Sequence, residues 1–385
     1  MEQGRLIYLD NAATTFPKPR AVAQETWRCL VRYGGNPGRG SHSLSLAAAQ
    51  KVFECRELAA ELFGVSEPER VFFTMNTTHG LNTVIKGLLR DGDHVIISDM
   101  EHNAVYRPLF KLAEQGRVEF DTFSSMTADP RKSDMLICAN IARRMRPNTR
   151  MVVCTHISNI CSAMLPIQRI GEFCHRYGLL FVVDGAQSAG HERISVDEMN
   201  IDALCVPGHK GLYGPQGCGM VILGRGVCPE TLCEGGNGVN SLEGSMPELS
   251  PERYEAGTLP TAAIAGLCEG IRAVQNIGVE RIGEYERMLF CGARERLEAI
   301  PRLRIYVPED EGATLLFNID GIPSETVCSA LDAQGICVRG GYHCTALGHR
   351  TLGTPEGGAV RISFGIYNTV SELDALYRAL LNIGV

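Results

Sequence analysis

The sequence of 385 residues lacks any uninterrupted apolar stretch of about 18 residues, the length that a membrane-spanning helix needs. Its first residues contain no apolar run of the length found in signal peptides. It also lacks an excess of basic residues, since 37 Lys and Arg stand against 44 Asp and Glu, a formal net charge of −7. Because nucleic acids bind to basic faces, we expect neither nucleic acid nor membrane as a partner, and we expect a soluble, cytoplasmic protein.

No two of the 15 cysteines have the Cys-x-x-Cys spacing that marks many zinc sites. We therefore predict no metal site, and we expect reduced thiols in a long chain without a signal peptide. Most cysteines, such as Cys138, Cys154 and Cys205, lie within apolar runs and are interpreted as small core residues. Composition alone does not indicate which cysteine is a nucleophile.

The chain is long enough for one large domain and a smaller one, and its 44% hydrophobic and 21% charged residues are typical of globular proteins. The sequence contains no internal repeat and no low-complexity tract. Apolar runs predict strands at residues 70–74, 93–98, 150–155 and 179–183, with a helix from Leu81 to Leu89 after the first of them. Strands that alternate with helices indicate a parallel sheet covered on both faces.

Lys210 follows the apolar run Ala203–Val206 and lies beside His209, among glycines that continue to Gly219. Glycines allow the backbone to approach a bound molecule closely, and burial of an amine favours loss of its proton. A deprotonated lysine forms a Schiff base with an aldehyde. Alone, the stretch is equally consistent with a surface lysine in a glycine-rich turn.

Asp184 ends the apolar run Leu179–Val183, which is expected to be a buried strand. Ligands of open α/β sheets gather at the carboxyl ends of parallel strands. Asp184 alone is also consistent with a helix N-cap. Together with Lys210 it favours pyridoxal phosphate, which requires a Schiff-base lysine and an acidic partner for its ring nitrogen.

Asp184-Gly-Ala-Gln187 followed by Gly208-His-Lys210 resembles the class V aminotransferase group of fold-type I pyridoxal phosphate enzymes. Within this group the chain is most similar to the cysteine desulfurases, including their selenocysteine lyase relatives. Similar motifs run from Tyr8 to Thr369, nearly the whole chain. The resemblance implies an α/β fold in which a large domain with a mainly parallel seven-stranded sheet is joined to a smaller α+β C-terminal domain.

The resemblance also implies where the two domains lie. It assigns residues 17–261 to the large, cofactor-binding domain, and residues 1–16 and 262–385 to the small domain with the catalytic cysteine loop. Glu255-Ala-Gly-Thr258 resembles an element that crosses to the other subunit, where the threonine completes the phosphate site. We therefore expect a homodimer with shared active sites.

Small hydroxyl residues between a strand and a helix N-terminus suit a phosphate group, although they also serve as helix caps. Thr77 and Thr78 occupy such a position. By resemblance His102 stacks on the pyridine ring and takes part in acid–base steps, while a histidine there is otherwise often structural. The resemblance assigns cofactor contacts to a larger set: Lys210, Asp184, Gln187, Asn159, His102, Thr77, Thr78, His209 and Thr258.

Cys344 lies outside any apolar run, next to His343 on a loop with glycines. Exposure beside a potential cation favours the nucleophilic thiolate, although a loop cysteine of no consequence fits the same pattern. The run from Arg339 to Cys344 resembles the group II (SufS-like) desulfurases, whose cysteine receives sulfur as a persulfide.

Arg361 lies in an expected strand, and a planar guanidinium fork suits a substrate α-carboxylate, although a structural ion pair is the alternative. The resemblance assigns substrate contacts to Arg361, Asn159, Asn11 and Ala13. It assigns the catalytic steps to Lys210, Cys344 and His102. These residues imply conversion of L-cysteine to L-alanine, with a persulfide on Cys344 for an acceptor.

Two other functions remain open from the sequence. A selenocysteine lyase uses the same residues, so the sequence does not distinguish cysteine from selenocysteine. A sulfur-relay module that has little activity without its partner is the third possibility, and the identity of the acceptor is not encoded in any motif. The chain also departs from the family pattern at Pro207, Pro260 and Tyr342, the first two near the expected phosphate site.

Overall fold

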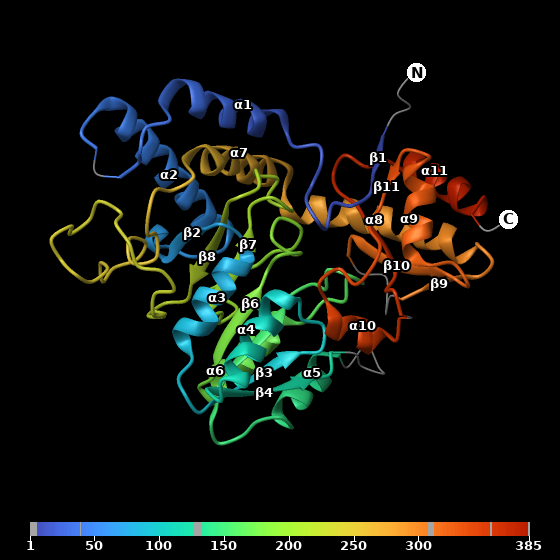
Figure 1. Cartoon of the computed structure of the whole chain (residues 1–385), viewed down its shortest axis with the longest axis horizontal. Helices are drawn as coiled ribbons and strands as arrows, with labels where there is room; N and C mark the ends of the chain where they lie inside the picture. Colours follow the sequence, from blue (N-terminus) through green and yellow to red (C-terminus); the bar gives the residue numbers. More distant parts are fainter. Residues whose placement is uncertain (1–5, 39, 126–132, 307–311, 355, 384–385) are drawn as a thin grey trace.

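A seven-stranded sheet is the centre of the computed structural model, which describes residues 6–38, 40–125, 133–306, 312–354 and 356–383 (Figure 1). Its strand order is β2-β8-β7-β6-β5-β3-β4, and only β8 runs antiparallel to its neighbours. The strands are β2 (Val71–Thr74), β3 (Asp93–Ser98), β4 (Val118–Phe123), β5 (Thr149–Thr155), β6 (Leu180–Asp184), β7 (Ala203–Pro207) and β8 (Gly219–Leu223). The predicted α/β fold with a mainly parallel seven-stranded sheet is confirmed.

Both faces of the sheet are buried, which explains the runs of consecutive apolar residues in its central strands, such as Met151–Cys154 of β5 and Leu180–Val183 of β6. On β5, Val152 and Cys154 pack into one core while Met151 and Val153 pack into the other, as the two-residue period of a strand requires. The first core includes α2 (Ser43–Leu62), α5 (Ser133–Ala142), α6 (Ile167–Tyr177) and α7 (Thr261–Ile277). The second includes α3 (Thr77–Leu88) and α4 (Asn103–Glu114).

A smaller antiparallel sheet, in the order β12-β10-β9, lies at the right of Figure 1 with α8, α9 and α11. Its elements are β9 (Leu303–Ile305), β10 (Thr314–Ile319), β12 (Val360–Ser363), α8 (Val279–Glu298), α9 (Ser324–Asp332) and α11 (Val370–Leu381). The N-terminal strand β1 (Ile7–Tyr8) pairs with β11 (Ile336–Cys337), and Leu9 is buried in the same core. This arrangement is α+β, whereas the predicted division at residues 16/17 and 261/262 remains a prediction.

Helix α3 begins at Thr77, four residues before the start expected from its apolar spacing. The side chain of Asn76 caps it by accepting a hydrogen bond from the His79 N–H at 2.9 Å. Asn is among the preferred N-cap residues because its short side chain satisfies a free donor of the first turn. The cap therefore sets Thr77 and Thr78 in the first turn, at the carboxyl end of β2.

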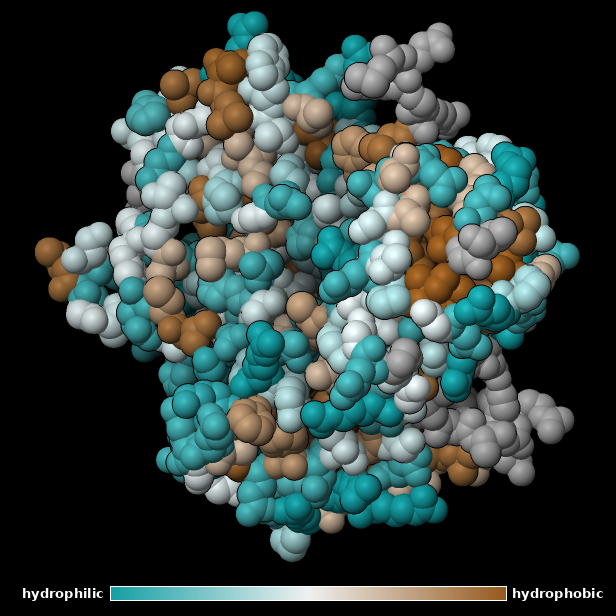
Figure 2. All heavy atoms as spheres, turned by 45° about the vertical axis from the view of Figure 1, so that its right-hand side comes forward, coloured by the Kyte–Doolittle hydropathy of each residue, from teal (hydrophilic) through white to brown (hydrophobic). Residues whose placement is uncertain are grey.

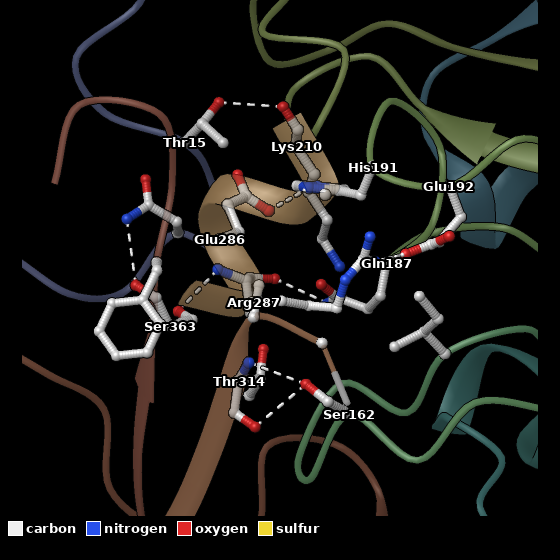
Figure 3. A pocket seen from close by; sticks show the side chains of 17 residues that line it. Thr15, Ser162, Gln187, His191, Glu192, Lys210, Glu286, Arg287, Thr314 and Ser363 are labelled. Carbon is white, nitrogen blue, oxygen red and sulfur yellow. Dashed lines mark hydrogen bonds and ion pairs between the residues drawn. The ribbon is translucent and has the colours of Figure 1, made fainter. Parts of the chain in front are cut away.

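Two ion pairs connect the loop after β6 with α8 of the C-terminal part. The Nδ1 atom of His191 pairs with Glu286, and Arg287 pairs with Glu192 (Figure 3). Burial lowers the pKa of His191, but the Glu286 carboxylate more than offsets this, so that the pKa of His191 is raised. None of the helices in the described ranges is both long and apolar enough to span a bilayer.

We expect the free energy of unfolding to depend on pH through His191. Because the pKa of His191 is raised in the folded protein, the pair with Glu286 contributes fully below about pH 6.5 and loses its contribution as the pH rises through the folded-state pKa. Glu286→Gln should therefore lower the free energy of unfolding by about 3 kcal/mol at pH 6 and by less at pH 9. Urea unfolding of both proteins across this range measures the difference. A difference that grows with pH would contradict the assignment.

Candidate active site

A cavity of about 340 Å³ opens where the carboxyl ends of the central strands face the loop that follows β11. This volume lies within the range of small-molecule sites. Its walls contain nearly all the residues that the sequence predicts to bind or react. These are Lys210, Asp184, Cys344, Arg361, His102, Asn159, Gln187, Thr77, Thr78, His209 and Ala13.

Lys210 lies just beyond the end of β7, on the cavity wall. Burial lowers the pKa of its amine to about 8, against the opposing attraction of Asp184. The N-terminal segment holds the backbone at this point. Thr15 Oγ1 donates to the Lys210 carbonyl at 3.0 Å, and Lys18 Nζ donates to the His209 carbonyl at 2.7 Å. The lowered pKa is consistent with the expectation of an amine that loses its proton readily, and the role of Lys210 as the Schiff-base lysine remains a prediction.

Asp184 is the last residue of β6, and only 2% of its surface is exposed. Burial raises the pKa of its carboxyl group, and both the Ala186 N–H and the charge of Lys210 oppose that rise. The Ala186 N–H donates to Asp184 Oδ1 at 2.9 Å and so fixes the carboxylate. The predicted acid and amine, 26 residues apart by their numbers (210 − 184), thus share one cavity.

The first turn of α3 lines the cavity through Thr77 and Thr78, and His209 lines it as well. Thr77 Oγ1 and His209 Nδ1 are buried and have no hydrogen-bond partner among the described residues. A buried polar atom without a partner is costly, and a helix N-terminus attracts anions. A phosphate group at this point would supply acceptors for both, so these residues fit the phosphate of pyridoxal phosphate.

His102 is the N-cap of α4, and its Nδ1 accepts a hydrogen bond from the Ala104 N–H at 3.0 Å. Burial, with the charges of Lys210 and Arg361, lowers the pKa of His102 to about 4. The imidazole is therefore neutral at pH 7, and its proton lies on Nε2 because Nδ1 is the acceptor. A neutral ring of this kind suits stacking on an aromatic cofactor.

The amides of Gln187 and Asn159 also line the cavity. Gln187 Nε2 donates to the Ala12 carbonyl at 2.9 Å, which ties the N-terminal segment to the loop after β6. Asn159 Nδ2 donates to the His343 carbonyl at 2.9 Å. The cofactor contacts that the resemblance assigns to these amides remain predictions.

Asp10 lies between Arg339 and Arg361. Its Oδ2 atom accepts from Arg339 Nη2 at 2.7 Å, and its Oδ1 atom accepts from Arg361 Nη2 at 2.8 Å. Arg361 is 3% exposed, and its Nε atom has no hydrogen-bond partner among the described residues. Arg361 therefore belongs to a structural ion pair and still offers donors that suit a substrate carboxylate.

Cys344 is exposed and lines the cavity. The expectation that the neighbouring histidine supplies a cation is wrong, because burial lowers the pKa of His343 to about 3 and leaves it neutral. The guanidinium of Arg339, which pairs with Asp10, lines the same cavity as Cys344.

Two predicted residues lie outside this cavity. Asn11 Nδ2 donates to the Ser363 carbonyl and to Asn368 Oδ1, each at 3.1 Å, and Asn11 lines a second cavity. Thr258 is exposed on the loop before α7, outside the cavity of its own chain. The expected substrate contact of Asn11 and the cross-subunit contact of Thr258 remain predictions.

The second cavity, of about 30 Å³, lies on the other side of Lys210 and Gln187, which line both spaces. Figure 3 shows Thr15, Lys210 and the paired side chains of His191 and Glu286 above it, with Ser162 and Thr314 below. A space of this size holds about two water molecules at roughly 15 Å³ each.

The three residues that depart from the family pattern lie at a strand end, at a helix N-terminus and on the Cys344 loop. Pro207 ends β7 on the cavity wall, and Pro260 is the N-cap residue of α7. Tyr342 packs edge-on against His349, and its hydroxyl accepts from the Gly357 N–H at 3.0 Å. Tyr342 therefore ties the Cys344 loop to the segment before β12.

The comparisons with known proteins agree with this geometry. The family described as Aminotransferase class-V matches residues 7–376. A probable cysteine desulfurase of Methanothermobacter thermautotrophicus is 34% identical over 98% of this chain and 94% of the relative. A probable cysteine desulfurase of Mycolicibacterium paratuberculosis is also 34% identical over 98% of this chain, but the chain spans only 55% of that relative. The apo structure of a cysteine desulfurase from Thermococcus onnurineus superposes with a TM-score of 0.86, at 29% identity over 98% of this chain and 94% of that one.

We expect Asp10→Asn to destabilise the protein strongly, because it removes the charge that compensates the buried Arg361. Breaking a buried ion pair on one side costs about 3 kcal/mol or more. The matched control is Asp91→Asn, which breaks the exposed pair with Arg117 and should cost less than about 1 kcal/mol. Urea unfolding at pH 7 measures both. Equal losses in the two variants would show that the Asp10 cluster contributes no more than a surface pair.

Proposed function

The chain belongs to the class V aminotransferase family, and we propose that it catalyses the cysteine desulfurase reaction, like the relatives named above. With pyridoxal phosphate on Lys210, it converts L-cysteine to L-alanine and keeps the sulfur as a persulfide on Cys344. The observation that carries this proposal is that Lys210, Asp184, Arg361 and Cys344 line one cavity although they come from distant parts of the chain. The predicted family, fold class and enzyme class agree with the comparisons.

The cofactor site includes two buried polar atoms, Thr77 Oγ1 and His209 Nδ1, that have no hydrogen-bond partner among the described residues. Lys210 would hold the aldehyde carbon, Asp184 the ring nitrogen, and Thr77, Thr78 and His209 the phosphate. When bound, pyridoxal phosphate serves as an electron sink for the substrate's α-carbon. The buried carboxylate of Asp184 would favour a protonated ring nitrogen, because the positive charge of the protonated ring stabilises the negative charge of the carboxylate.

The substrate's α-carboxylate is held by Arg361, whose orientation Asp10 and the Asn159 carbonyl fix at 2.8 and 3.0 Å. Burial lowers the pKa of Lys210 to about 8, so the amine is a free base in about a tenth of molecules at pH 7 and in about half at pH 8, and in this form it accepts the α-proton. His102 is neutral and holds its proton on Nε2, from which it donates to a group in the cavity.

The Cys344 thiolate attacks the sulfur atom of the substrate. The S–S bond forms as the substrate's C–S bond breaks, and the electron pair of that bond passes to Cβ, which takes a proton to become the methyl group of alanine. The thiolate is the nucleophilic form of a cysteine, and Cys344 is exposed at the cavity wall. The persulfide then passes to an acceptor, which is a protein or a small molecule.

The relatives named above are cysteine desulfurases, so they give no support to a selenocysteine lyase or a sulfur-relay module. The preference for cysteine over selenocysteine is part of the proposal. The cytoplasmic location and the absence of a nucleic-acid partner stay predictions of the sequence.

We also propose a homodimer with shared active sites, for which two surface features speak. A cavity of about 570 Å³ separates α2 from the loop around residues 235–259. That loop presents Leu242 and Leu249, which are 101% and 77% exposed, and α2 presents Phe53 beside it. The loop protrudes at the left of Figure 1, and Figure 2 shows hydrophobic side chains at the left edge of the molecular face. Exposed apolar groups around a deep cavity are typical of protein interfaces.

Cys344→Ser should abolish alanine formation from L-cysteine, with a loss of at least about 100-fold, because the hydroxyl is a poor nucleophile towards sulfur. Its bound-cofactor absorbance should equal that of the wild type, while Lys210→Ala should lose the lysine-linked form. Cys228→Ser is the matched control, an exposed thiol outside the cavity that should leave alanine formation unchanged. Retained turnover of L-cysteine in Cys344→Ser would refute the persulfide role, and turnover of L-selenocysteine alone would favour the lyase alternative.

Sedimentation equilibrium should give twice the chain mass of 41.9 kDa. Leu249→Asp should weaken the dimer by about 10-fold or more, because it places a charge in an apolar contact. Met135→Asp, at an apolar position of α5 that is 77% exposed like Leu249, should leave the mass unchanged. A monomeric wild-type protein would rule out the shared active site.

A further inference from the structure

The loop that carries Cys344 has an unusual backbone. His343 and Cys344 both have positive φ angles, 51° and 57°, although neither is glycine. A side chain in this left-handed region crowds the following carbonyl group, so such residues persist only where the surroundings hold them. The Cys344 thiol therefore lies on a backbone that its own sequence does not favour.

Three hydrogen bonds stabilise this backbone, and they involve Asn159 and Asn103 from other parts of the chain and Thr345 from the end of the loop. Asn159 Nδ2 donates to the His343 carbonyl at 2.9 Å, and the Asn103 N–H donates to the Cys344 carbonyl at 2.8 Å. Thr345 Oγ1 donates to Asn159 Oδ1 at 2.7 Å. The side chains that form this set are buried, with Asn159 8% exposed and Thr345 fully buried.

The carbonyl of His343 determines which way the Asn159 amide faces, because a carbonyl only accepts and so requires the amide nitrogen. The amide oxygen then faces Thr345, whose hydroxyl donates to Asn159 Oδ1 at 2.7 Å and also lies 3.2 Å from the His343 carbonyl. A residue at 345 without a hydroxyl would leave Oδ1 without this donor and the amide less firmly held.

Asn159 is also fixed from its other side. Its backbone carbonyl accepts from Arg361 Nη1 at 3.0 Å, and its side chain lies on the wall of the cavity that contains Lys210. The amide nitrogen has a second hydrogen that the His343 contact does not use. Asn159 thus connects the carboxylate-binding arginine, the cavity and the thiol loop.

We propose that Asn159 and Thr345 are positioning residues for the Cys344 thiol. Together they hold residues 343 and 344 in the left-handed conformation that presents the thiol to the cavity. This role goes beyond the cofactor contact expected of Asn159, and it rests on the proposed function of Cys344 as the sulfur acceptor. A thiol that is free to leave this conformation meets the substrate sulfur less often, even when substrate and cofactor bind normally.

The test uses Thr345→Val, which keeps the side-chain volume and removes the donor, and Thr345→Ser, which restores it. In the cofactor-loaded enzyme we expect Thr345→Val to slow single-turnover persulfide formation on Cys344 by about 10- to 100-fold, because a misplaced reacting group has effects of this size. The KM for L-cysteine and the cofactor absorbance should stay within about twofold, and Thr345→Ser should recover the rate to within about threefold. Thr83→Val controls for the loss of a buried hydroxyl, since Thr83 donates to the His79 carbonyl inside α3.

A second readout does not depend on turnover. Hydrogen exchange of the peptide covering residues 342–346, measured on protein stripped of cofactor, should be about 10-fold faster in Thr345→Val than in the wild type and unchanged in Thr83→Val. If Thr345→Val does not fold, Thr345→Ala and Asn159→Ala test the same contacts.

The outcomes separate the inference from the proposed function. A wild-type enzyme that forms no persulfide on Cys344 overturns the proposed function, while the exchange measurement still tests whether Asn159 and Thr345 hold the loop. Unchanged exchange in Thr345→Val overturns the inference. Faster exchange with an unchanged rate of persulfide formation also overturns it, because the loop would then be held without effect on the thiol's reaction.

Discussion

The ion pairs of the Asp10 carboxylate connect the parts of the chain that form the active site. It pairs with Arg339 and Arg361, and so joins the N-terminal segment to the thiol loop and to β12. Without it, the buried guanidinium of Arg361 would lose its ion pair with Oδ1, which is costly. The same N-terminal segment continues to Thr15, which bonds the Lys210 carbonyl. The Asp10 carboxylate therefore helps to fix the positions of the amine, the carboxylate-binding arginine and the thiol loop relative to one another.

Much of the fold could be predicted from the sequence because the central strands are buried on both faces. The run 93–98 has the apolar centre Val-Ile-Ile, and β3 has those bounds. An apolar run carries no information on strand direction, so the antiparallel course of β8 could not be read from it. Apolar spacing predicts a start of α3 at Leu81, which is too late. The first turn begins after the Asn76 cap and contains hydroxyl residues instead of apolar ones.

The site was predictable where local context determines chemistry. Lys210 lies among glycines and Asp184 at a strand end, and both line the expected cavity. Asp10 could not be identified, because its role depends on Arg361, a partner 351 residues away. Nor could the neutral state of His343, since the burial that lowers its pKa arises only from tertiary packing. The pairing of Arg339 with Asp10 is hidden in the same way, because the two residues are 329 positions apart.

The pairing of Asp10 with distant arginines has a consequence for biosynthesis. The ribosome releases the segment around Asp10 before the large sheet, and the strands of that sheet emerge well before Arg361. Proteins of this size generally fold by parts as they are made. The large sheet is thus complete before its cofactor pocket is, and the nascent chain closes its catalytic centre only after β12 has emerged. Premature termination between the end of the large sheet and β12 would yield a chain that contains Lys210 but lacks the residues that close the cavity around it.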